Sequence, residues 1–289
     1  MRSLGWPAPA KLNLFLHVTG RRADGFHELQ TAFQLIDLCD SLDFEVCEDG
    51  TIERVAGNAT VAAEDDLVVR AARLLQRHGG SRRGVRITLA KRIPLQGGLG
   101  GGSSDAATTL VALNELWQAG IGVDELAALG LELGADVPVF VRGTSAWAEG
   151  VGEKLAPLEL PPRWFAVIWP AVAVSTGKVF QAPELTRNSP KITIRGFLQT
   201  GGRNDCEPVV TARYPEVRQA LDWLGQFGTA RMTGTGSCVF AAFVAQDDAA
   251  RALRNLPGGW DGFVVRGLAV SPLLGRLEAE KTARRADLG

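Results

Sequence analysis

The sequence predicts an α+β protein built from two domains. Its 289 residues suggest two domains or one large one, and the 46% of apolar residues is enough for a substantial core. Segments with the two-residue alternation of strands are mixed with segments of helical periodicity. The stretch Val151–Pro162, rich in Pro, Glu and Gly, is the best candidate for a boundary. We therefore expect domains at residues 1–160 and 161–289.

Charge and composition exclude several classes of function. The 31 basic and 32 acidic residues give a net charge of −1, which argues against a nucleic-acid partner. The four cysteines lack zinc-type or redox spacing and are expected to be buried reduced thiols, and three scattered histidines make a metal site improbable. Lys11 interrupts the only early apolar stretch, which argues against a signal peptide, and the most apolar run, Trp164–Val174, is too short to span a membrane. We expect a cytoplasmic protein without a membrane partner.

The first strand is predicted by alternation near the start of the chain. Apolar residues occupy every second position, Leu12, Leu14, Leu16 and Val18, between Lys11, Asn13, Phe15 and His17. This pattern is typical of a half-buried strand and places Lys11 and Asn13 on the face opposite the leucines. Asp24-Gly25 indicates a turn, and Phe33–Val46 indicates further strand.

Two helices flank a glycine-rich segment in the first half. Asp65 or Asp66 is the expected cap of the first helix, which ends at Gly79-Gly80. Val85–Leu89 alternates as a strand and leads into the glycines. Beyond them a helix is indicated by helical spacing of Ala106, Leu110, Leu113 and Trp117. The next helix, Asp124–Leu133, stops at Gly134 and places Asp136 just past its end.

The second half alternates strands and helices. The expected elements are a strand at Trp164–Trp169, a polar linker around Pro183–Pro190, a helix near Pro215–Phe227, a glycine turn at Gly234–Gly236 between strands, a helix over Asp247–Asn255 and a strand at Phe263–Val270.

The strongest functional signal is the glycine-rich run. Five of the six residues in Gly97–Gly102 are glycine, which lets backbone N–H groups approach an anion without a Cβ in the way. The run leads into a helix, so free N–H groups and the positive end of the helix dipole would meet there. A flexible linker is the alternative, although linkers do not usually join a strand to an apolar helix. Lys91 and Arg92 precede the run and are interpreted as a solvated strand end, with a contact to the phosphates as the alternative.

Two common nucleotide motifs do not fit this run. A P-loop needs Lys and then Ser or Thr after its last glycine, but Gly102 is followed by Ser103-Ser104. No register matches G-x-G-x-x-G, which disfavours a Rossmann dehydrogenase. Asp105 competes with phosphate for the positive end of the helix, and we assign it to helix stabilisation.

Three segments together resemble the GHMP kinase superfamily, which includes galactokinase, homoserine kinase and mevalonate kinase. They are Pro7–Leu14, Pro94–Ala107 and Met232–Phe240. Within it, the sequence resembles the 4-diphosphocytidyl-2-C-methyl-D-erythritol kinases at Lys11–Leu14, Asp24–His27, Gly134–Pro138 and Asn204–Pro208. The resemblance implies an N-terminal ATP-binding domain like domain 2 of ribosomal protein S5 and a C-terminal ferredoxin-like α/β plait. It also implies phosphorylation by ATP, with Mg²⁺, of the 2-hydroxyl of a cytidine-diphosphate-linked methylerythritol in the non-mevalonate route to isoprenoids.

The same resemblance assigns roles to particular residues. Asp136 becomes the catalytic base and Lys11 its partner, whereas the residues alone leave open a helix cap and a solvated lysine. The expected ATP-binding residues are Pro94, Leu95, Gln96, Gly97, Gly98, Leu99, Gly100, Gly101, Gly102, Ser103 and Ser104. The ligands of Mg²⁺ stay open, with Ser104 as a candidate.

Substrate binding is expected from Asn13, Phe26, His27 and Phe180. Phe26 stands where the family usually has a tyrosine and, with Phe180, would stack on the cytosine, while His27 would bind its edge. The alternatives are a core role for Phe180 and a surface histidine at His27. Another GHMP kinase with a different alcohol, or a nucleotide-binding protein without activity, also stays open. We expect a monomer or a homodimer.

Overall fold

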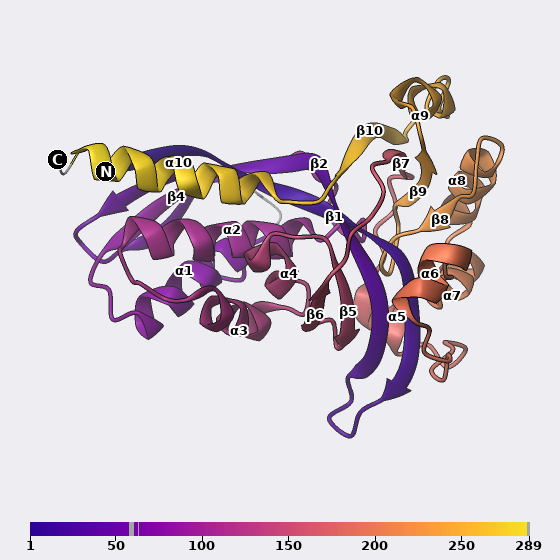
Figure 1. The fold of residues 1–289 in the computed structure, drawn as a ribbon, viewed down its shortest axis with the longest axis horizontal. Coiled ribbons are helices and arrows are strands. Elements are labelled where there is room, and N and C mark those ends of the chain that lie inside the picture. Colours follow the sequence, from indigo (N-terminus) through magenta and orange to yellow (C-terminus); the bar gives the residue numbers. More distant parts are fainter. Residues whose placement is uncertain (58–60, 63, 288–289) are drawn as a thin grey trace.

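A long hairpin of strands β1 (Arg2–Arg21) and β2 (His27–Cys47) runs between two lobes (Figure 1). The computed structural model describes residues 1–57, 61–62 and 64–287. The hairpin turns at Asp24-Gly25, as predicted. Gly25 has a φ of 90°, which favours glycine, and Asp24 Oδ1 accepts a hydrogen bond of 3.1 Å from the N–H of Phe26. The tip of the hairpin extends beyond both lobes in Figure 1.

The N-terminal lobe packs helices on one sheet. Strand β2 pairs antiparallel with β4 (Gly84–Ala90) and β5 (Ala146–Gly150), β4 pairs parallel with β3 (Ile52–Ala56), and β5 pairs with β6 (Lys154–Pro157). The helices are α1 (Leu67–His78), α2 (Gly101–Leu116), α3 (Val123–Leu133) and α4 (Val137–Arg142). Their apolar faces share one core with Trp6, Phe44 and Phe140, each at most 1% exposed.

The C-terminal lobe contains a second antiparallel layer. Its strands lie in the order β10 (Asp261–Leu268), β7 (Trp164–Trp169), β9 (Val239–Phe243) and β8 (Arg231–Met232). Helices α5 (Thr176–Phe180), α6 (Ile194–Thr200), α7 (Glu207–Arg213), α8 (Pro215–Gly225) and α9 (Gln246–Ala252) complete the lobe. Strand β10 also pairs with β2 at Gly267 and Leu268, so the two layers form one continuous sheet.

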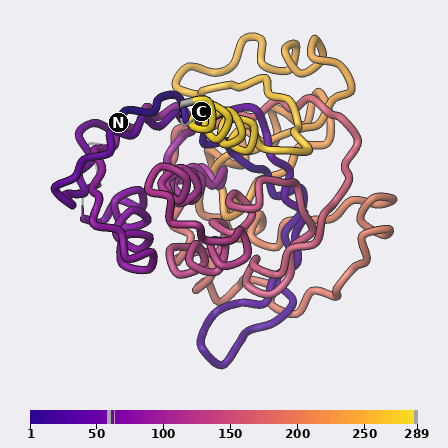
Figure 2. The backbone as a smooth tube through the Cα atoms, turned by 60° about the vertical axis from the view of Figure 1, so that its left-hand side comes forward, coloured from indigo at the N-terminus to yellow at the C-terminus, as the bar shows by residue number. Residues whose placement is uncertain are grey.

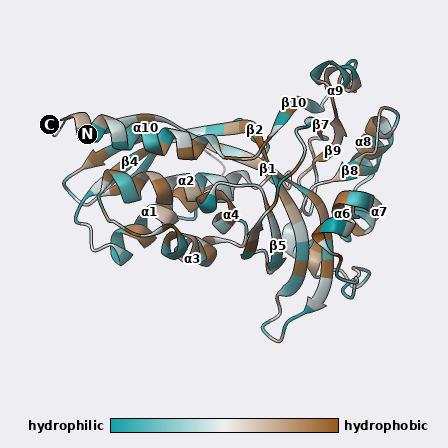
Figure 3. Ribbon diagram, viewed as in Figure 1, coloured by the Kyte–Doolittle hydropathy of each residue, from teal (hydrophilic) through white to brown (hydrophobic). Residues whose placement is uncertain are grey.

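The last helix, α10 (Pro272–Asp287), lies against the N-terminal lobe. Leu273 is buried in the N-terminal core, and the guanidinium of Arg276 lies 4.5 Å from the ring centre of Trp6. Hydrophilic and hydrophobic residues both occur along α10 (Figure 3), as expected of a helix with one face on the protein. Figure 2 shows the two termini on the same side of the molecule. The contacts of α10 with β1 thus join the last described helix to the first strand. The division into domains at residue 160 stays a prediction.

Strand β1 differs from its prediction because both of its faces are buried. Lys11 and Asn13 are each 3% exposed, on the face that the alternation assigned to solvent. The C-terminal lobe covers this part of the strand: the N–H of Leu16 donates to Arg203 O at 3.0 Å, and the N–H of Asn13 donates to Thr233 Oγ1 at 2.9 Å. Alternation within one strand carries no information on such a distant partner.

The structure also confirms or corrects expectations about the cap of α1, the boundary stretch and the cysteines. Asp66 is the cap of α1, since its Oδ1 accepts a hydrogen bond of 3.0 Å from the N–H of Val68. The boundary stretch Val151–Pro162 contains part of a hairpin, β5–β6, and α4 follows directly on Asp136. Two of the four cysteines, Cys39 and Cys47, are only partly buried, and all four are free thiols. In the described ranges no helix has both the length and the apolar character that a membrane crossing requires.

Candidate active site

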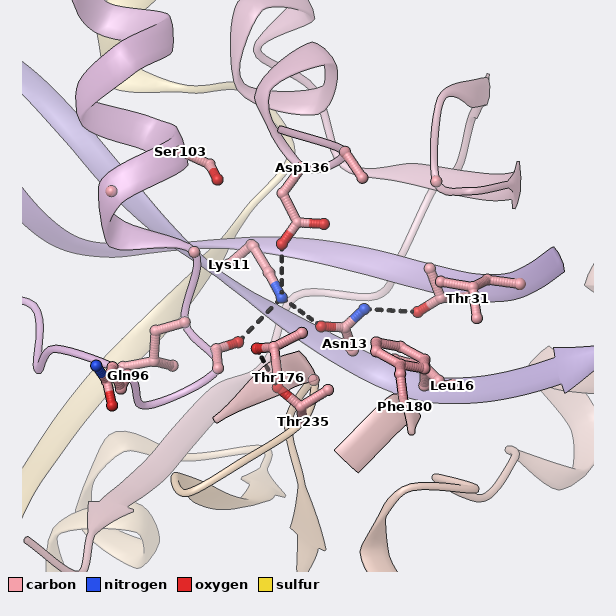
Figure 4. Close-up of a pocket in the computed structure, with 18 of the residues that line it drawn as sticks. Lys11, Asn13, Leu16, Thr31, Gln96, Ser103, Asp136, Thr176, Phe180 and Thr235 are labelled. Atoms are coloured by element: carbon pink, nitrogen blue, oxygen red, sulfur yellow. Dashed lines mark hydrogen bonds and ion pairs between the residues drawn. The ribbon is translucent and has the colours of Figure 1, made fainter. Parts of the chain in front are cut away.

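A cavity of about 930 Å³ opens between the lobes and collects nearly all of the predicted site residues. The predicted residues that line it are Lys11, Asn13, Phe26, His27, Pro94, Leu95, Gln96, Gly97, Gly98, Leu99, Gly100, Gly101, Gly102, Ser103, Asp136 and Phe180. Ser104 lies behind the lining and is fully buried. Several of these side chains are drawn in Figure 4.

The glycine run forms the start of α2. Gly100 adopts a left-handed conformation with a φ of 73° and is the N-cap residue, so α2 begins at Gly101, inside the cavity wall. The first backbone N–H groups of a helix have no partner within it, and the helix dipole adds partial positive charge there. The 16 residues of α2 therefore aim a donor-rich end at the cavity, which suits an anionic group such as phosphate.

Part of the glycine run serves packing between segments. A Cβ at Gly98 would lie 2.3 Å from Thr233 O, and one at Gly97 would lie 2.7 Å from Cys238 Sγ. The N–H of Cys238 also donates to Gly97 O at 3.0 Å. The first two glycines are thus required by the close approach of the turn after β8, a reason that the sequence did not indicate.

We expect Gly98→Ala to destabilise the protein and Gly102→Ala to leave it stable. Gly98 has a φ of 75° and no room for a methyl group, whereas a Cβ at Gly102 would meet Leu67 Cδ1 at an ordinary 3.4 Å. The melting temperature of Gly98→Ala should fall by about 4 °C or more. Calorimetric melting of both variants checks this, and equal melting temperatures would contradict a packing role for Gly98.

The centre of the site is an ion pair between Lys11 on β1 and Asp136, which precedes α4 in the N-terminal lobe. Lys11 Nζ lies 3.3 Å from Asp136 Oδ2, donates to Gly98 O at 2.9 Å and also donates to Asn13 Oδ1 (Figure 4). Its ammonium group lies 5.5 Å from the ring centre of Phe33. Lys11 is therefore buried, its ammonium group has polar partners on several sides, and its positive charge lies in the lining of the cavity.

Asp136 presents its carboxylate to the cavity because of where it lies in the chain. It occupies the N-cap position of α4, after α3 has ended at Gly134, yet its side chain makes no capping hydrogen bond. The carboxylate pairs with Lys11 instead and keeps 32% of its surface exposed. The reading of Asp136 as a mere helix cap finds no support in this geometry.

Asn13 is held by a network of hydroxyl groups. Its Nδ2 donates to Thr31 Oγ1 at 2.9 Å, and Thr233 Oγ1 donates to Gly98 O at 3.3 Å. The turn that carries Thr233 is fixed by Asn204, whose Nδ2 donates to Met232 O at 2.9 Å and to Gly234 O at 2.8 Å. The motif Asn204–Pro208 thus supports the turn that packs on the glycine run.

The tip of the hairpin and helix α5 meet at the other end of the cavity. The rings of His27 and Phe180 stack at 5.2 Å between centres and 24° between planes. Phe26 also lines the cavity but is 62% exposed. Burial lowers the pKa of His27, and the nearby charges of Arg187 and Arg21 lower it further.

The interpretation of Lys91 as a solvated strand end is wrong. Its ammonium group is partly buried between two buried carboxylates, donating to Asp40 and, at 2.7 Å, to Asp105 Oδ2. Burial alone lowers the pKa of Lys91, but the two carboxylates outweigh it and raise the pKa. Burial raises the pKa of Asp105 to about 8, against the effect of Lys91. Asp105 therefore anchors α2 to the preceding strand.

Comparison with known proteins agrees with this geometry. The family described as GHMP kinases N terminal domain matches residues 66–144, and the family described as GHMP kinases C terminal matches residues 190–261. A 4-diphosphocytidyl-2-C-methyl-D-erythritol kinase of Nitrosococcus oceani is 58% identical over 94% of this chain and 98% of its own. The chain belongs to this family of GHMP kinases. A kinase of the same name from Halorhodospira halophila is 57% identical over 96% of this chain and 98% of its own.

Solved structures place this kinase in the expected fold. A crystal structure of 4-(cytidine 5'-diphospho)-2C-methyl-D-erythritol kinase has a TM-score of 0.78 and 37% identity, covering 93% of this chain and all of that chain. A homoserine kinase of Cytophaga hutchinsonii, at a TM-score of 0.69 and 16% identity, covers 94% of this chain and 95% of its own and shares the fold alone. The predicted α+β GHMP kinase fold and the predicted enzyme class are confirmed.

Three residues of the kinase's site were missed by sequence reasoning, namely Thr31, Thr176 and Arg187, which all line the cavity. Thr235 also lines it and belongs to the glycine turn of the motif Met232–Phe240, which was expected to approach the phosphates or the substrate. Thr176 Oγ1 and Thr235 Oγ1 lie within hydrogen-bond distance of each other, 2.9 Å apart, in the part of the cavity wall that the C-terminal lobe supplies (Figure 4). Arg187 lies in the segment Pro183–Pro190, which was expected to be only a polar linker. An isolated threonine or arginine outside a motif gives no sequence signal of this kind.

Proposed function

We propose that this kinase transfers the γ-phosphoryl group of ATP to the 2-hydroxyl of 4-diphosphocytidyl-2-C-methyl-D-erythritol, a step of the non-mevalonate isoprenoid route. The observation that carries the proposal is the ion pair of Lys11 and Asp136, 3.3 Å apart, beside the N-terminus of α2. An acceptor for a hydroxyl proton, a cation and an anion-binding helix end thus meet in one cavity. The names of the relatives supply the identity of the substrate.

In this mechanism Asp136 is the base and Lys11 its partner. Asp136 Oδ accepts the proton of the 2-hydroxyl as that oxygen bonds to the γ-phosphorus, and the bond to the β-phosphate oxygen breaks to release ADP. Lys11 holds the carboxylate in place and offsets negative charge that develops on the phosphoryl group. Asn13, which accepts from Lys11, is positioned to contact the substrate in the same cavity.

ATP is proposed to place its phosphates on residues 94–104. The backbone N–H groups at the start of α2 would bind phosphate oxygens, and Ser103 adds a hydroxyl to the cavity wall. Among the described residues, Ser104 Oγ is buried without a hydrogen-bond partner. A hydroxyl oxygen can bind Mg²⁺, so Ser104 is the candidate ligand, and its side chain would have to turn from behind the cavity wall toward the phosphates to reach the metal. Mg²⁺ would offset charge on the phosphates when bound.

The cytidine end is proposed to bind at His27, Phe26 and Phe180. These residues come from the hairpin tip and from α5, so residues 161–289 would contribute to substrate binding. We also propose a monomer or homodimer in the cytoplasm. The four free thiols suit a reducing compartment.

The experiment that tests this function compares acceptors directly. ATP consumption is measured with the cytidylated methylerythritol and, separately, with homoserine, mevalonate and galactose. We expect turnover only with the cytidylated compound. Turnover with another alcohol would assign the chain a different substrate, and no turnover with any of them would contradict the proposed activity.

Loss of the Phe26 ring should weaken substrate binding without affecting ATP. A base stacked on an aromatic ring gains about 1–3 kcal/mol, so Phe26→Ala should raise the Kd of the cytidylated substrate by about 5- to 150-fold. Phe26 is exposed at the hairpin tip, so its removal should leave the fold intact. Calorimetric titration with each ligand measures both affinities. Phe26→Tyr is the matched control and should bind the cytidylated substrate almost as tightly as the wild type. A weaker ATP affinity in Phe26→Ala would place this ring in the ATP site.

A further inference from the structure

Arg187 connects the two aromatic residues of the proposed cytidine site. Its Nε donates to His27 Nε2 at 3.1 Å, and its Nη2 donates to Phe180 O at 3.0 Å and to Ala182 O at 2.7 Å. Nη1 donates to Leu185 O at 3.0 Å. The guanidinium therefore satisfies carbonyl groups at and beyond the end of α5 while it reaches the hairpin of the other lobe. No other function described above uses this residue.

The chemistry of the guanidinium determines the protonation of His27. An arginine stays protonated and has no acceptor, so its Nε always donates. The imidazole nitrogen that faces it must then accept with a free lone pair, which leaves the proton of the neutral ring on Nδ1. Burial and the charges of Arg187 and Arg21, the charged groups that act on this ring, lower its pKa in the same sense.

The ring is also fixed in orientation. His27 stacks on Phe180 at 5.2 Å, and Arg187 holds the backbone of Phe180 with the same guanidinium that holds the ring nitrogen. One side chain thus sets both the plane and the tautomer of His27. A cytosine ring offers acceptors at O2 and N3, so a histidine whose Nδ1–H is held in one orientation presents a donor that this edge can accept, whereas the Nε2–H tautomer would not donate from Nδ1.

We propose that Arg187 is a positioning residue for the cytosine end of the substrate, holding His27 as a neutral Nδ1–H donor stacked on Phe180. This inference rests on the proposed function, because that function supplies the cytosine. Arg187 acts through His27 and has no part in phosphoryl transfer.

The first test reads the tautomer in the free enzyme. Long-range ¹H–¹⁵N spectra of the kinase distinguish an Nδ1–H ring from an Nε2–H ring, and His27→Gln assigns the signals among the three histidines. We expect wild-type His27 to be neutral at pH 7.5 with its proton on Nδ1. A ring that carries its proton on Nε2, or on both nitrogens, would overturn the inference without any variant having to fold.

The second test removes the hydrogen bonds of the arginine. Arg187→Met should shift His27 towards the Nε2–H form, raise its pKa and raise the KM for the cytidylated substrate by about tenfold, with kcat within about twofold. An unchanged tautomer with an unchanged KM would overturn the inference.

Arg21→Met is the matched control for charge. Arg21 lies opposite His27 in the hairpin and lowers its pKa, but the hydrogen bond to Nε2 comes from Arg187. This variant should raise the pKa of His27 and keep the Nδ1–H form; a change of tautomer equal to that in Arg187→Met would overturn the inference. A wild-type enzyme with the expected tautomer that phosphorylates a different alcohol would refute the proposed function alone.

Discussion

Asp136→Asn should lower kcat by roughly 10²–10⁴-fold while the KM values for ATP and the cytidylated substrate change little. The asparagine keeps the size of the side chain but cannot take the proton of the attacking hydroxyl. Asp136 makes no capping hydrogen bond to α4, and Lys11 keeps its bonds to Gly98 O and Asn13. The melting temperature should therefore stay close to that of the wild type.

Steady-state kinetics with both substrates measure this effect. Asp124→Asn is the matched control, since Asp124 is an exposed carboxylate that pairs with Arg142 on the surface. It should retain full turnover. If Asp136→Asn also retained near-normal turnover in a folded protein, positioning alone would carry the rate and Asp136 would not be the base.

Lys11→Met is expected to lower kcat by roughly 10²–10³-fold and also to reduce stability. The variant removes the cation that faces the reacting groups. It also leaves the buried Asn13 Oδ1 without its ammonium donor and the Asp136 carboxylate without its counter-charge. A loss of several degrees in melting temperature should accompany the loss of rate.

The double variant Lys11→Met/Asp136→Asn tests whether the two residues act as a unit. Their side chains are 3.3 Å apart, so we expect the loss in the double variant to be much smaller than the product of the two single losses. Lys191→Met, at an exposed lysine paired with Glu149, is the control for a lost surface ion pair and should be neutral. Fully multiplicative losses would mean that Lys11 and Asp136 act independently.

Local signals in the sequence were sufficient for most of the fold. The strand Trp164–Trp169 was predicted correctly from its short apolar run, and Asp66 was one of the two expected caps of α1, because both signals depend on neighbours in the chain. The helix α4 was missed because it is short and begins directly after Asp136. The burial of both faces of β1 was missed because the covering residues, such as Thr233, lie far away in the sequence.

In the site, too, residues within local motifs were predicted, whereas residues whose roles depend on distant partners were not. Lys11, Asp136 and the glycine run belong to motifs, and the structure brings them together. Lys91 was misread because its two carboxylate partners, Asp40 and Asp105, lie on a different strand and on a helix. Arg187 gave no signal, since its hydrogen bonds depend on how a loop folds back on α5.

The position of α10 has a consequence for how the chain folds as it is made. Trp6 at the start of β1 is covered by Arg276, and Leu273 completes the core of the lobe that β1 begins. A ribosome makes Leu273 and Arg276 after the whole of the second lobe, so the N-terminal lobe lacks α10 while the second lobe is being synthesised. The strands and helices of the second lobe must therefore emerge before the core of the first lobe closes. The order of synthesis and the order of tertiary closure differ in this enzyme, because the first lobe reaches its native packing only after the second lobe has been made.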